Sequence, residues 1–371
     1  MTEDWVTENY INCAVWASVE DDVLDYFFDK FNIKPTKPAR RLMQFFVANL
    51  MRMSKSDKEA LALSLDKTPG IGRRSISRLI NQLEEDGLIE VRRGYVSKGG
   101  SKHLTKVKPK SKDMIYPLRA AKGIYTKDSR IFVTNNGDRK LIPFSELTCE
   151  GLDRNNTLER YSSFLEDIEI CSGDKVIDSC FTRSIYRDNY KLHGRIYSDW
   201  QTISSDERKL ITLNGSPVME LDYACMGVNI IYNMMGRVLN KDAYSFSDKV
   251  TRDEAKKIVN ILINAKSKPS ALAAIRSNFG TKFNARSILR EAESYHSPIK
   301  SMFYSCVGLK TMNIDANIAN RVISHSTDLQ IPILSIHDGF VLPQSCKEEL
   351  TRIMKESYFH YMNNDICINE D

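Results

Sequence analysis

Two short segments of this chain each place a carboxylate at the point where an apolar run suited to a β-strand ends. The first, Val218–Asn233, reads VMELDYACMGVNIIYN and carries Asp222; the second, Ile331–Pro343, reads IPILSIHDGFVLP and carries Asp338. A carboxylate at the end of an apolar strand lies at the edge of a sheet, where a ligand can reach it. Since the segments are far apart in the chain, a fold that uses both acids together must bring the two strands side by side.

A helix predicted between the two segments, Thr251–Ala265, begins with a capping box made by Thr251 and Glu254. Its apolar stripe consists of Ala255, Ile258, Val259 and Leu262, and its polar row of Arg252, Lys256, Asn260 and Asn264. At ~1.5 Å of rise per residue, this row is roughly 18 Å long. Arginine and lysine bind phosphates, so the row and the two acids together predict a site for divalent metal and a nucleoside triphosphate. Taken alone, each part is also compatible with an ordinary surface helix or hairpin.

Composition limits the class of protein. A chain of 371 residues exceeds one ordinary core, so two or three domains are expected. Apolar residues make up 42% and charged residues 27%, as in globular proteins, and no apolar run is long enough to span a bilayer. The N-terminus lacks the basic and apolar segments of a secretory signal. The eight cysteines are scattered without a CxxC pair, which predicts buried free thiols and an intracellular, reducing compartment.

The net charge of +5 is unevenly distributed. The segment Lys67–Lys112 contains twelve lysines and arginines against four acids, so the rest of the chain is slightly acidic. Positive charge confined to one segment favours a polyanionic partner. For the lysines after residue 97, a solvated surface remains a competing interpretation.

The same segment belongs to a pattern of helices and strands over residues 37–110. We expect helices over 39–53, 57–65 and 74–86 and strands over 88–91 and 104–107. A turn with Pro69, Gly70 and Gly72 precedes the third helix, and Gly87 ends it. This order is that of a winged helix-turn-helix.

The stretch RSISRLINQLEEDGLIEVRRG resembles the recognition helix and wing of winged-helix DNA-binding proteins. Donors on the helix face opposite the apolar stripe suit a major groove: Arg73, Arg74, Ser75, Ser77, Arg78, Asn81 and Gln82. Wing cations suited to phosphates are Arg92, Arg93, Lys98 and Lys102. A winged helix used for protein contacts is the alternative, against which the excess of positive charge argues.

The second half of the chain resembles the palm and fingers of superfamily A polymerases, which include family A DNA polymerases and single-subunit phage-type RNA polymerases. HGRIY (193–197) is similar to their primer–template element, LDYACMGVN (221–229) to motif A, RDEAKKIVNILINA (252–265) to motif B, and SIHDGFVLP (335–343) to motif C. The resemblance covers residues 190–345 and points to the compact transposon–virus group.

The resemblance implies an α+β fold in which a winged helix-turn-helix precedes a compact right-hand polymerase domain. The expected segments are a helical arm over 1–36, the winged helix over 37–110, a connecting or thumb-like region over 111–190, and palm and fingers over 191–371.

Two-metal nucleotidyl transfer follows as the implied chemistry. Asp222 and Asp338 would hold two Mg²⁺ or Mn²⁺ ions with the Tyr223 carbonyl, and Lys256 would assist the pyrophosphate. Arg252, Asn260, Asn264, Gly227 and Tyr223 would contact the nucleotide, and Arg195 and His337 would contact primer and template.

This sequence departs from the family pattern at several positions. Gly227 stands where DNA enzymes carry a glutamate that blocks ribose, so room for a 2′-hydroxyl is expected. Asn260 and Asn264 stand where motif B has aromatics, and Ala265 replaces a glycine. Gly339 stands where DNA enzymes place a glutamate. These departures leave the choice between DNA and RNA or primer synthesis open.

We therefore expect a template-directed polymerase or primase of a phage, plasmid or transposon, with DNA and nucleoside triphosphates as partners and no membrane. Two alternatives remain. One is a replication initiator or transcriptional regulator whose palm is not catalytic; the other is an RNA-binding protein that uses the palm as a platform.

Overall fold

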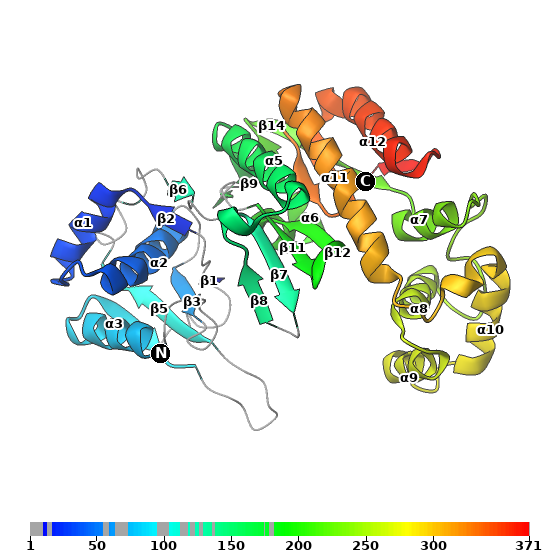
Figure 1. Cartoon of the computed structure of the whole chain (residues 1–371), viewed down its shortest axis with the longest axis horizontal. Coiled ribbons are helices and arrows are strands. Elements are labelled where there is room, and N and C mark those ends of the chain that lie inside the picture. Colours follow the sequence, from blue (N-terminus) through cyan, green and yellow to red (C-terminus); the bar gives the residue numbers. More distant parts are fainter. Residues whose placement is uncertain are drawn as a thin grey trace. The chain divides into compact units, whose positions relative to one another are not determined.

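The protein is described by a computed structural model that covers residues 10–12, 17–54, 59–63, 73–94, 104–111, 118, 123–125, 129–135, 138–173, 175–177 and 182–370. The fold is mixed α+β, as predicted. The chain forms two compact units (Figure 1). The first contains residues 1–130, 143–146 and 169–180, and the second contains residues 131–142, 147–168 and 181–371. This division differs from the four predicted segments, because the arm joins the first unit and much of 111–190 joins the second.

The first unit combines helices with short strands. Its helices are α1 (Asp21–Lys30), α2 (Lys37–Ser54) and α3 (Arg73–Glu85), and a 3-10 turn, η2, covers Phe144–Glu146. Its strands are β1 (Tyr10–Asn12), β2 (Ala17–Val19), β3 (Ala60–Leu63), β4 (Ile89–Arg92), β5 (Thr105–Pro109), β6 (Gly123–Tyr125), β9 (Ile170–Ser172) and β10 (Lys175–Val176). One sheet has the order β1-β3-β5-β4, in which β5 is antiparallel to both β3 and β4.

The arm helix α1 packs on α2 through aromatic rings. The ring centroids of Phe27 and Phe31 lie 5.3 Å apart, and Phe31 lies 6.4 Å from Phe46 of α2. Arg40 of α2 forms ion pairs with Asp21 and Asp25 of α1. The aromatic rings of Phe27 and Phe31 therefore belong to the packing face of this helix.

Within residues 37–110, the predicted helices over 39–53 and 74–86 and the predicted strands over 88–91 and 104–107 are confirmed. The short helix expected over 57–65 is wrong where the structure describes it, because Ala60–Leu63 is strand β3. All four of its residues are at most 2% exposed, and the strand pairs with β5. A short apolar run carries no periodicity that separates a buried strand from a helix, so pairing decided the outcome.

The second unit is built around two sheets and a long helix. Its strands are β7 (Ile131–Asn135), β8 (Asp138–Leu141), β11 (Arg183–Arg187), β12 (Asn189–Tyr197), β13 (Ile211–Leu213), β14 (Ser216–Tyr223), β15 (Leu334–Ile336), β16 (Gly339–Pro343) and β17 (Ile368–Glu370). Its helices are α5 (Cys149–Glu166), α6 (Ser205–Arg208), α7 (Met226–Met234), α8 (Arg252–Asn264), α9 (Lys268–Phe279), α10 (Ala285–Tyr295), α11 (Gly308–Asp328) and α12 (Lys347–Met362). The 3-10 turns are η3 (Asp199–Thr202), η4 (Ser297–Met302) and η5 (Gln344–Cys346).

Within the second unit, the strands of the sheet that carries the two acidic segments follow the order β13-β14-β16-β15, with β17 added to β14. Every described pairing among these strands is antiparallel. β13 and β14 form a hairpin whose turn is Asn214–Gly215, with φ of 49° and 73°. Both residues have positive φ, as in the Asn-Gly turn that matches the twist of a hairpin.

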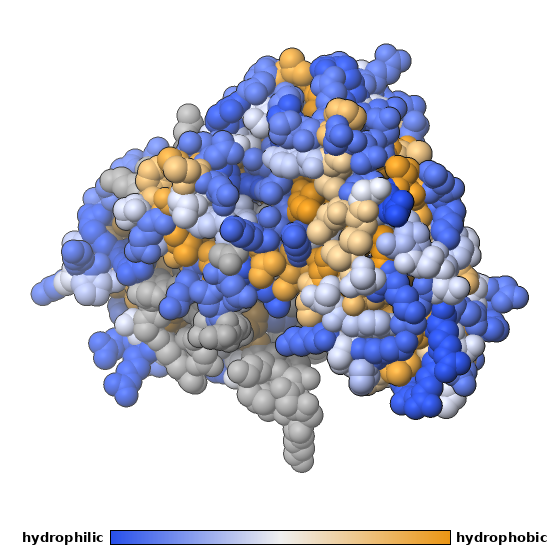
Figure 2. All heavy atoms as spheres, turned by 45° about the vertical axis from the view of Figure 1, so that its right-hand side comes forward, coloured by the Kyte–Doolittle hydropathy of each residue, from blue (hydrophilic) through white to orange (hydrophobic). Residues whose placement is uncertain are grey.

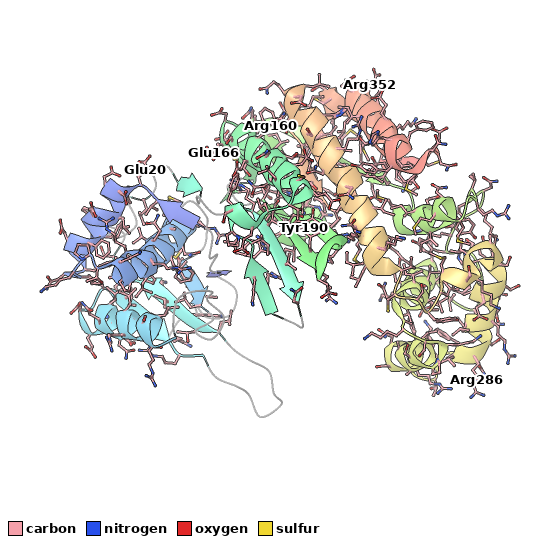
Figure 3. All side chains as sticks on the ribbon, in the orientation of Figure 1. Glu20, Arg160, Glu166, Tyr190, Arg286 and Arg352 are labelled. Atoms are coloured by element: carbon pink, nitrogen blue, oxygen red, sulfur yellow. The ribbon has the colours of Figure 1, made fainter. Side chains whose placement is uncertain are left out.

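Helix α11 links the parts of the second unit. It contacts β12, α5, α7, α8 and α12, and it crosses the unit in Figure 1 (orange) with α5 on one side and α12 on the other. Arg160 of α5, labelled in Figure 3, forms an ion pair with Asp328 at the end of α11. A separate core of buried apolar residues joins α7, α8 and α10, with Ile231, Ile258, Leu262 and Ile288 each 0% exposed.

The second-half helices that frame the acidic segments are confirmed. The predicted helix over 251–265 is α8, and Thr251 caps it with the expected capping box to Glu254. The segment 331–343 forms a hairpin, although its turn is not the Asp338–Gly339 pair that turn preferences in the sequence favour. Ile336 pairs with Gly339, so the turn residues are His337 and Asp338, and His337 takes a positive φ of 60°.

None of the helices in the described part of the chain is long and apolar enough to cross a membrane. The face drawn in Figure 2 is largely hydrophilic with scattered hydrophobic patches. The cysteines that the structure describes are free thiols, as predicted, but they are not buried: Cys149 and Cys367 are exposed and the others are half-buried.

Candidate active site

Of the two acids predicted from the strand ends, Asp222 lies on β14 and Asp338 lies in the turn that leads into the adjacent strand β16. Asp222 of β14 pairs directly opposite Gly339 of β16, the residue that follows Asp338. The Tyr223 N–H donates to the Asp338 carbonyl at 3.3 Å. A Cβ built on Gly339 would lie 3.6 Å from Oδ1 of Asp222. Asp222 and Asp338 therefore meet at one end of the β14–β16 pair, as the sequence predicted.

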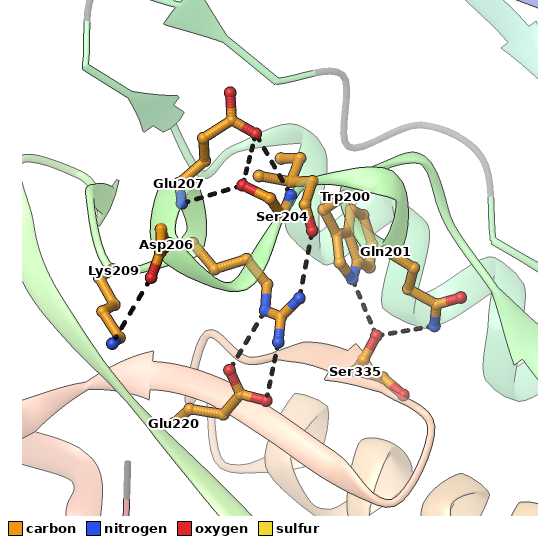
Figure 4. Close-up of polar contacts among 10 residues, drawn as sticks. Trp200, Gln201, Ser204, Asp206, Glu207, Lys209, Glu220 and Ser335 are labelled. Carbon is orange, nitrogen blue, oxygen red and sulfur yellow. Dashed lines mark hydrogen bonds and ion pairs between the residues drawn. The ribbon is translucent and has the colours of Figure 1, made fainter. Parts of the chain in front are cut away.

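The hairpin that presents Asp338 is held by side chains along the free edge of β15. Trp200 Nε1 and Gln201 Nε2 both donate to the Ser335 carbonyl at 2.9 Å (Figure 4). The buried Tyr161 hydroxyl donates to the Ile333 carbonyl at 2.8 Å and accepts from the Ser335 N–H at 3.3 Å. An edge strand whose backbone groups are satisfied in this way has little freedom to move its turn.

A second carboxylate, Glu220, lies on the same face of β14 as Asp222, because residues two apart on a strand share a face. Arg208 donates to it from Nε at 3.2 Å and from Nη2 at 3.4 Å (Figure 4). Both side chains are about four-fifths buried. Arg208 thus compensates the negative charge next to Asp222.

Asp222 and Asp338 open into a cavity of ≈ 1420 Å³. Predicted site residues that line it are Asp222, Asp338, Tyr223, Gly227, Arg195, Arg252, Lys256, Asn260 and Asn264. The whole polar row of α8 therefore faces the same space as the two carboxylates. Asn369 of β17 also lines it, directly opposite Asp222 on the edge of β14 away from β16.

Arg252, at the start of α8, lies against an acidic partner that sequence reasoning missed. Its Nε and Nη2 lie 3.4 Å from the Asp242 carboxylate, and its guanidinium is 5.1 Å from the centre of the Tyr244 ring. The hydroxyl of Ser245 and other donors, Arg252 among them, lower the pKa of Asp242. Arg252 remains 61% exposed, so this contact is weak enough to yield to a phosphate.

Two small residues shape the cavity. A Cβ on Gly227 would meet nothing within 4 Å, so there is open space beside this residue. Gly308, the first residue of α11, is tightly packed instead: a Cβ there would lie 2.1 Å from Oδ1 of Asn264. Asn264 also donates to the Asn260 carbonyl at 2.9 Å. The Asn264 side chain therefore packs against the start of α11 and bonds to the backbone of α8.

Two of the predicted contacts do not point into the cavity. The Tyr223 hydroxyl is buried and donates to the Met354 carbonyl at 2.7 Å, so only its backbone is placed for the predicted role. The ring of His337 packs edge-on against Tyr197 at 5.5 Å, and His337 is not among the residues that line the cavity. Burial lowers the pKa of His337, with Arg195 acting in the same direction.

Arg195 faces an acid that the sequence did not single out. Its Nη2 donates to Oδ2 of Asp315 at 2.5 Å, and its Nε lies 3.2 Å from both oxygens. Asp315, on α11, is 4% exposed and lines the cavity. Burial raises the pKa of Asp315 to about 6, since the lowering effect of Arg195 is smaller and the Asp338 charge adds to the increase.

The position of Asp315 in the sequence does indicate that it is buried. It falls on the buried stripe of α11, in step with Thr311, Ile318 and Val322, all of which are at most 3% exposed. An acid on an apolar stripe is rarely buried unless it has a partner. Such a position indicates a buried ion pair, although the sequence does not say with which residue.

The donor set at the strand ends fits divalent magnesium. Asp222, Asp338 and the backbone at Tyr223 offer few, hard oxygen ligands, and Mg²⁺ keeps several waters for substrate exchange. Within the described residues, no three acidic, histidine or cysteine side chains converge as a metal cluster.

In the first unit, the predicted nucleic-acid surface on α3 is exposed. Arg74, Ser75, Arg78 and Asn81 are exposed and Ser77 is half-buried. The stripe of Ile76, Leu79, Ile80 and Leu83 faces the core. This helix therefore presents its polar face outward, as the spacing predicted.

Other residues predicted to bind nucleic acid contact the protein itself, are half-buried or lie outside the described residues. Gln82 donates to the Phe31 carbonyl at 3.3 Å and so joins α3 to the rest of the unit. Arg93 is paired with Glu84, which reduces its availability to phosphates, and Arg92 is half-buried. Lys98, Lys102 and the side chain of Arg73 lie outside the described part of the chain.

No protein-family model matches this chain, and no curated protein matches its sequence.

Proposed function

We propose that the second unit is a template-directed nucleotidyltransferase similar to the compact superfamily A polymerases. The observation that carries the proposal is the meeting of Asp222 and Asp338 at the ends of paired strands, in one cavity with Arg252 and Lys256. The carboxylates are suited to bind metal ions, and the cations of α8 across the cavity are suited to bind phosphates. Nucleotidyl transfer requires both.

In this proposal the chain's residues act mainly by holding charge in place. Asp222 and Asp338 hold two Mg²⁺ ions, whose chemistry is to lower the pKa of an attacking 3′-hydroxyl and to neutralise the triphosphate. Lys256 and Arg252 bind the β- and γ-phosphates from α8, and Lys256 stabilises the departing pyrophosphate. Arg195 contacts the primer strand from β12.

The open space beside Gly227 supports acceptance of ribonucleotides. A Cβ at this position would meet no described atom within 4 Å outside its own stretch of helix backbone, so there is free space directly beside Gly227. We infer that a 2′-hydroxyl is tolerated and that RNA or primer synthesis is within reach of the enzyme.

The first unit is proposed as a winged helix-turn-helix that binds duplex DNA. Its support is the outward polar face of α3 and the β4–β5 pair that follows it, with β3 completing the sheet. Because Arg74 and Arg78 are proposed to read base edges, Arg74→Gln with Arg78→Gln should weaken duplex binding and relax its sequence preference. Arg40→Gln, which removes a cation already paired within the unit, is the matched control.

The central test is primer extension. Purified full-length protein with Mg²⁺, a primed template and labelled ribo- or deoxyribonucleotides should extend the primer. Asp338→Asn should abolish extension while leaving the melting temperature close to that of the wild type. Asp328→Asn, an exposed acid on α11 far along the helix from the cavity, serves as the control. If the wild type incorporates neither sugar on any primed or unprimed template, the proposal is wrong.

A further inference from the structure

Arg195 directly follows an irregular point in the backbone of β12. The register of β12 against β11 shifts around Tyr186, where His193 and Gly194 occupy the place of one residue. Both have positive φ, of 63° and 87°. A Cβ on Gly194 would lie 2.6 Å from a ring carbon of Tyr186, so both the backbone and the packing require glycine. A β-bulge of this kind turns the next side chain away from its regular direction.

Helix α11 holds this bulge through its side chains. Asn313 Nδ2 donates to the carbonyls of Tyr190 and His193 at 2.8 and 3.2 Å; Tyr190 is labelled in Figure 3. The Ser184 hydroxyl fixes the other side by donating to the Gly194 carbonyl at 2.5 Å. Asp315, two residues after Asn313, then meets Arg195. The bulge and the helix together therefore set where the guanidinium lies.

The geometry of the pair leaves part of Arg195 for another partner. Its contacts with Asp315 use Nε and Nη2, and within the described residues Nη1 makes no hydrogen bond. The Arg195 side chain is 22% exposed and the Asp315 side chain 6%, so both line the cavity but more of the guanidinium is accessible from it. An acceptor on a nucleic acid can thus bind Arg195 without displacing Asp315.

A contribution to stability does not explain why Arg195 and Asp315 form a buried ion pair. A buried ion pair contributes little net stability compared with apolar residues of the same size, because both charges lose their hydration. Its advantage is a fixed orientation, since a carboxylate that accepts from two guanidinium nitrogens allows few rotamers. The neighbouring charge of Asp338 would otherwise attract a mobile Arg195 toward the metal-binding end of the cavity.

We propose that Asp315 is a positioning residue that holds Arg195 beside the catalytic acids in the orientation that binds the primer strand. The inference rests on the proposed polymerase function. Asp315 itself touches no substrate; it acts by keeping Arg195 on the primer side of the cavity and away from Asp338.

The test compares Asp315→Asn, Arg195→Gln and the double variant by steady-state primer extension. Asp315→Asn should raise KM for the primed template about tenfold and change KM for the nucleotide much less. Because Asp315 acts through Arg195, the double variant should be no worse than Arg195→Gln alone. Asp328→Asn, on the same helix but exposed, should leave both constants unchanged.

Additional readouts separate this role from a structural one. Asp315→Glu should recover part of the template KM, and Arg195→Lys should show the same template defect as Asp315→Asn because lysine lacks the fork geometry. Arg195→Lys also serves if Asp315→Asn fails to fold. Equal losses for template and nucleotide, additive effects in the double variant, or a lower melting temperature with normal kinetics would overturn the inference. A wild type that extends no primer would instead refute the proposed function.

Discussion

Asp222 and Gly339 lie directly opposite each other on β14 and β16, and the space above Gly339 is bordered by two carboxylates. A Cβ at position 339 would lie 3.6 Å from Oδ1 of Asp222, 3.5 Å from Oε1 of Glu220 and 3.3 Å from the Leu221 carbonyl. A third acid at this point would therefore be added to charges that Arg208 only partly compensates.

The first prediction concerns that charge. Gly339→Glu should lower primer-extension kcat about tenfold more than Gly339→Gln, because the two side chains have the same size and only one repels Asp222 and Glu220. Gly339→Ala should have the smallest effect, since its one close contact requires a shift of a few tenths of an ångström. Equal activity of the Glu and Gln variants would show that volume, not charge, limits this position.

A second prediction concerns sugar selection. Gly227→Glu should fill the open space beside α7 and depress kcat/KM for ribonucleotides about tenfold more than for deoxyribonucleotides. Gly227→Ala, which adds a single carbon in the same space, should change the ratio little. The measurement is parallel extension with both nucleotide types, and equal losses for both would contradict a sugar gate at this position.

The third prediction concerns Asp242, which lies against the phosphate-binding Arg252. Asp242→Asn keeps an oxygen for the Tyr244 N–H, which it accepts at 3.2 Å, but removes a negative charge near the expected triphosphate. KM for nucleotides should fall about two- to threefold, as expected for a partly exposed ion pair. Asp248→Asn changes an exposed acid outside the cavity lining and is the control; the same KM in both variants would exclude the contact as an influence on binding.

A fourth prediction concerns stability below neutral pH. His296 is fully buried, bonded to the Ala243 carbonyl at 2.9 Å and the Tyr232 hydroxyl at 3.1 Å, and burial lowers its pKa to about 4. The unfolded chain therefore binds a proton near pH 6.5 that the folded chain takes up only near pH 4. The contribution of neutral His296 to the free energy of unfolding is fully present above pH 6.5. It is lost as the pH drops toward 4, and the loss amounts to about 3 kcal/mol at most.

Urea unfolding between pH 4 and 7 tests this linkage. His296→Gln should be less stable at neutral pH, because its hydrogen bonds change, but should lose less stability on acidification than the wild type. His360→Gln, an exposed histidine on α12, should keep the wild-type slope. If His296→Gln retains the same pH dependence, another group is responsible.

Local patterns in the sequence were sufficient for the elements that frame the cavity. The capping box at Thr251 and the stripe from Ala255 to Leu262 predicted α8 and its polar row, because helix starts and faces depend on residues within a few turns. The strand ends at Asp222 and Asp338 were predicted from apolar runs alone. The sequence predicted that the two strands lie side by side if both acids act together, and β14 does pair with β16, with Asp222 opposite Gly339.

Other features depended on contacts between distant segments. Ala60–Leu63 became a strand because β5 was there to pair with it, and the register of Ile336 with Gly339 moved the turn to His337–Asp338. Asp315 could be recognised as an acid on a buried stripe, but its partner lies 120 positions earlier in the chain. Periodicity and capping are short-range and can be read from neighbouring residues, whereas hydrogen-bond register and the pairing of buried charges are settled only when remote strands and helices pack together.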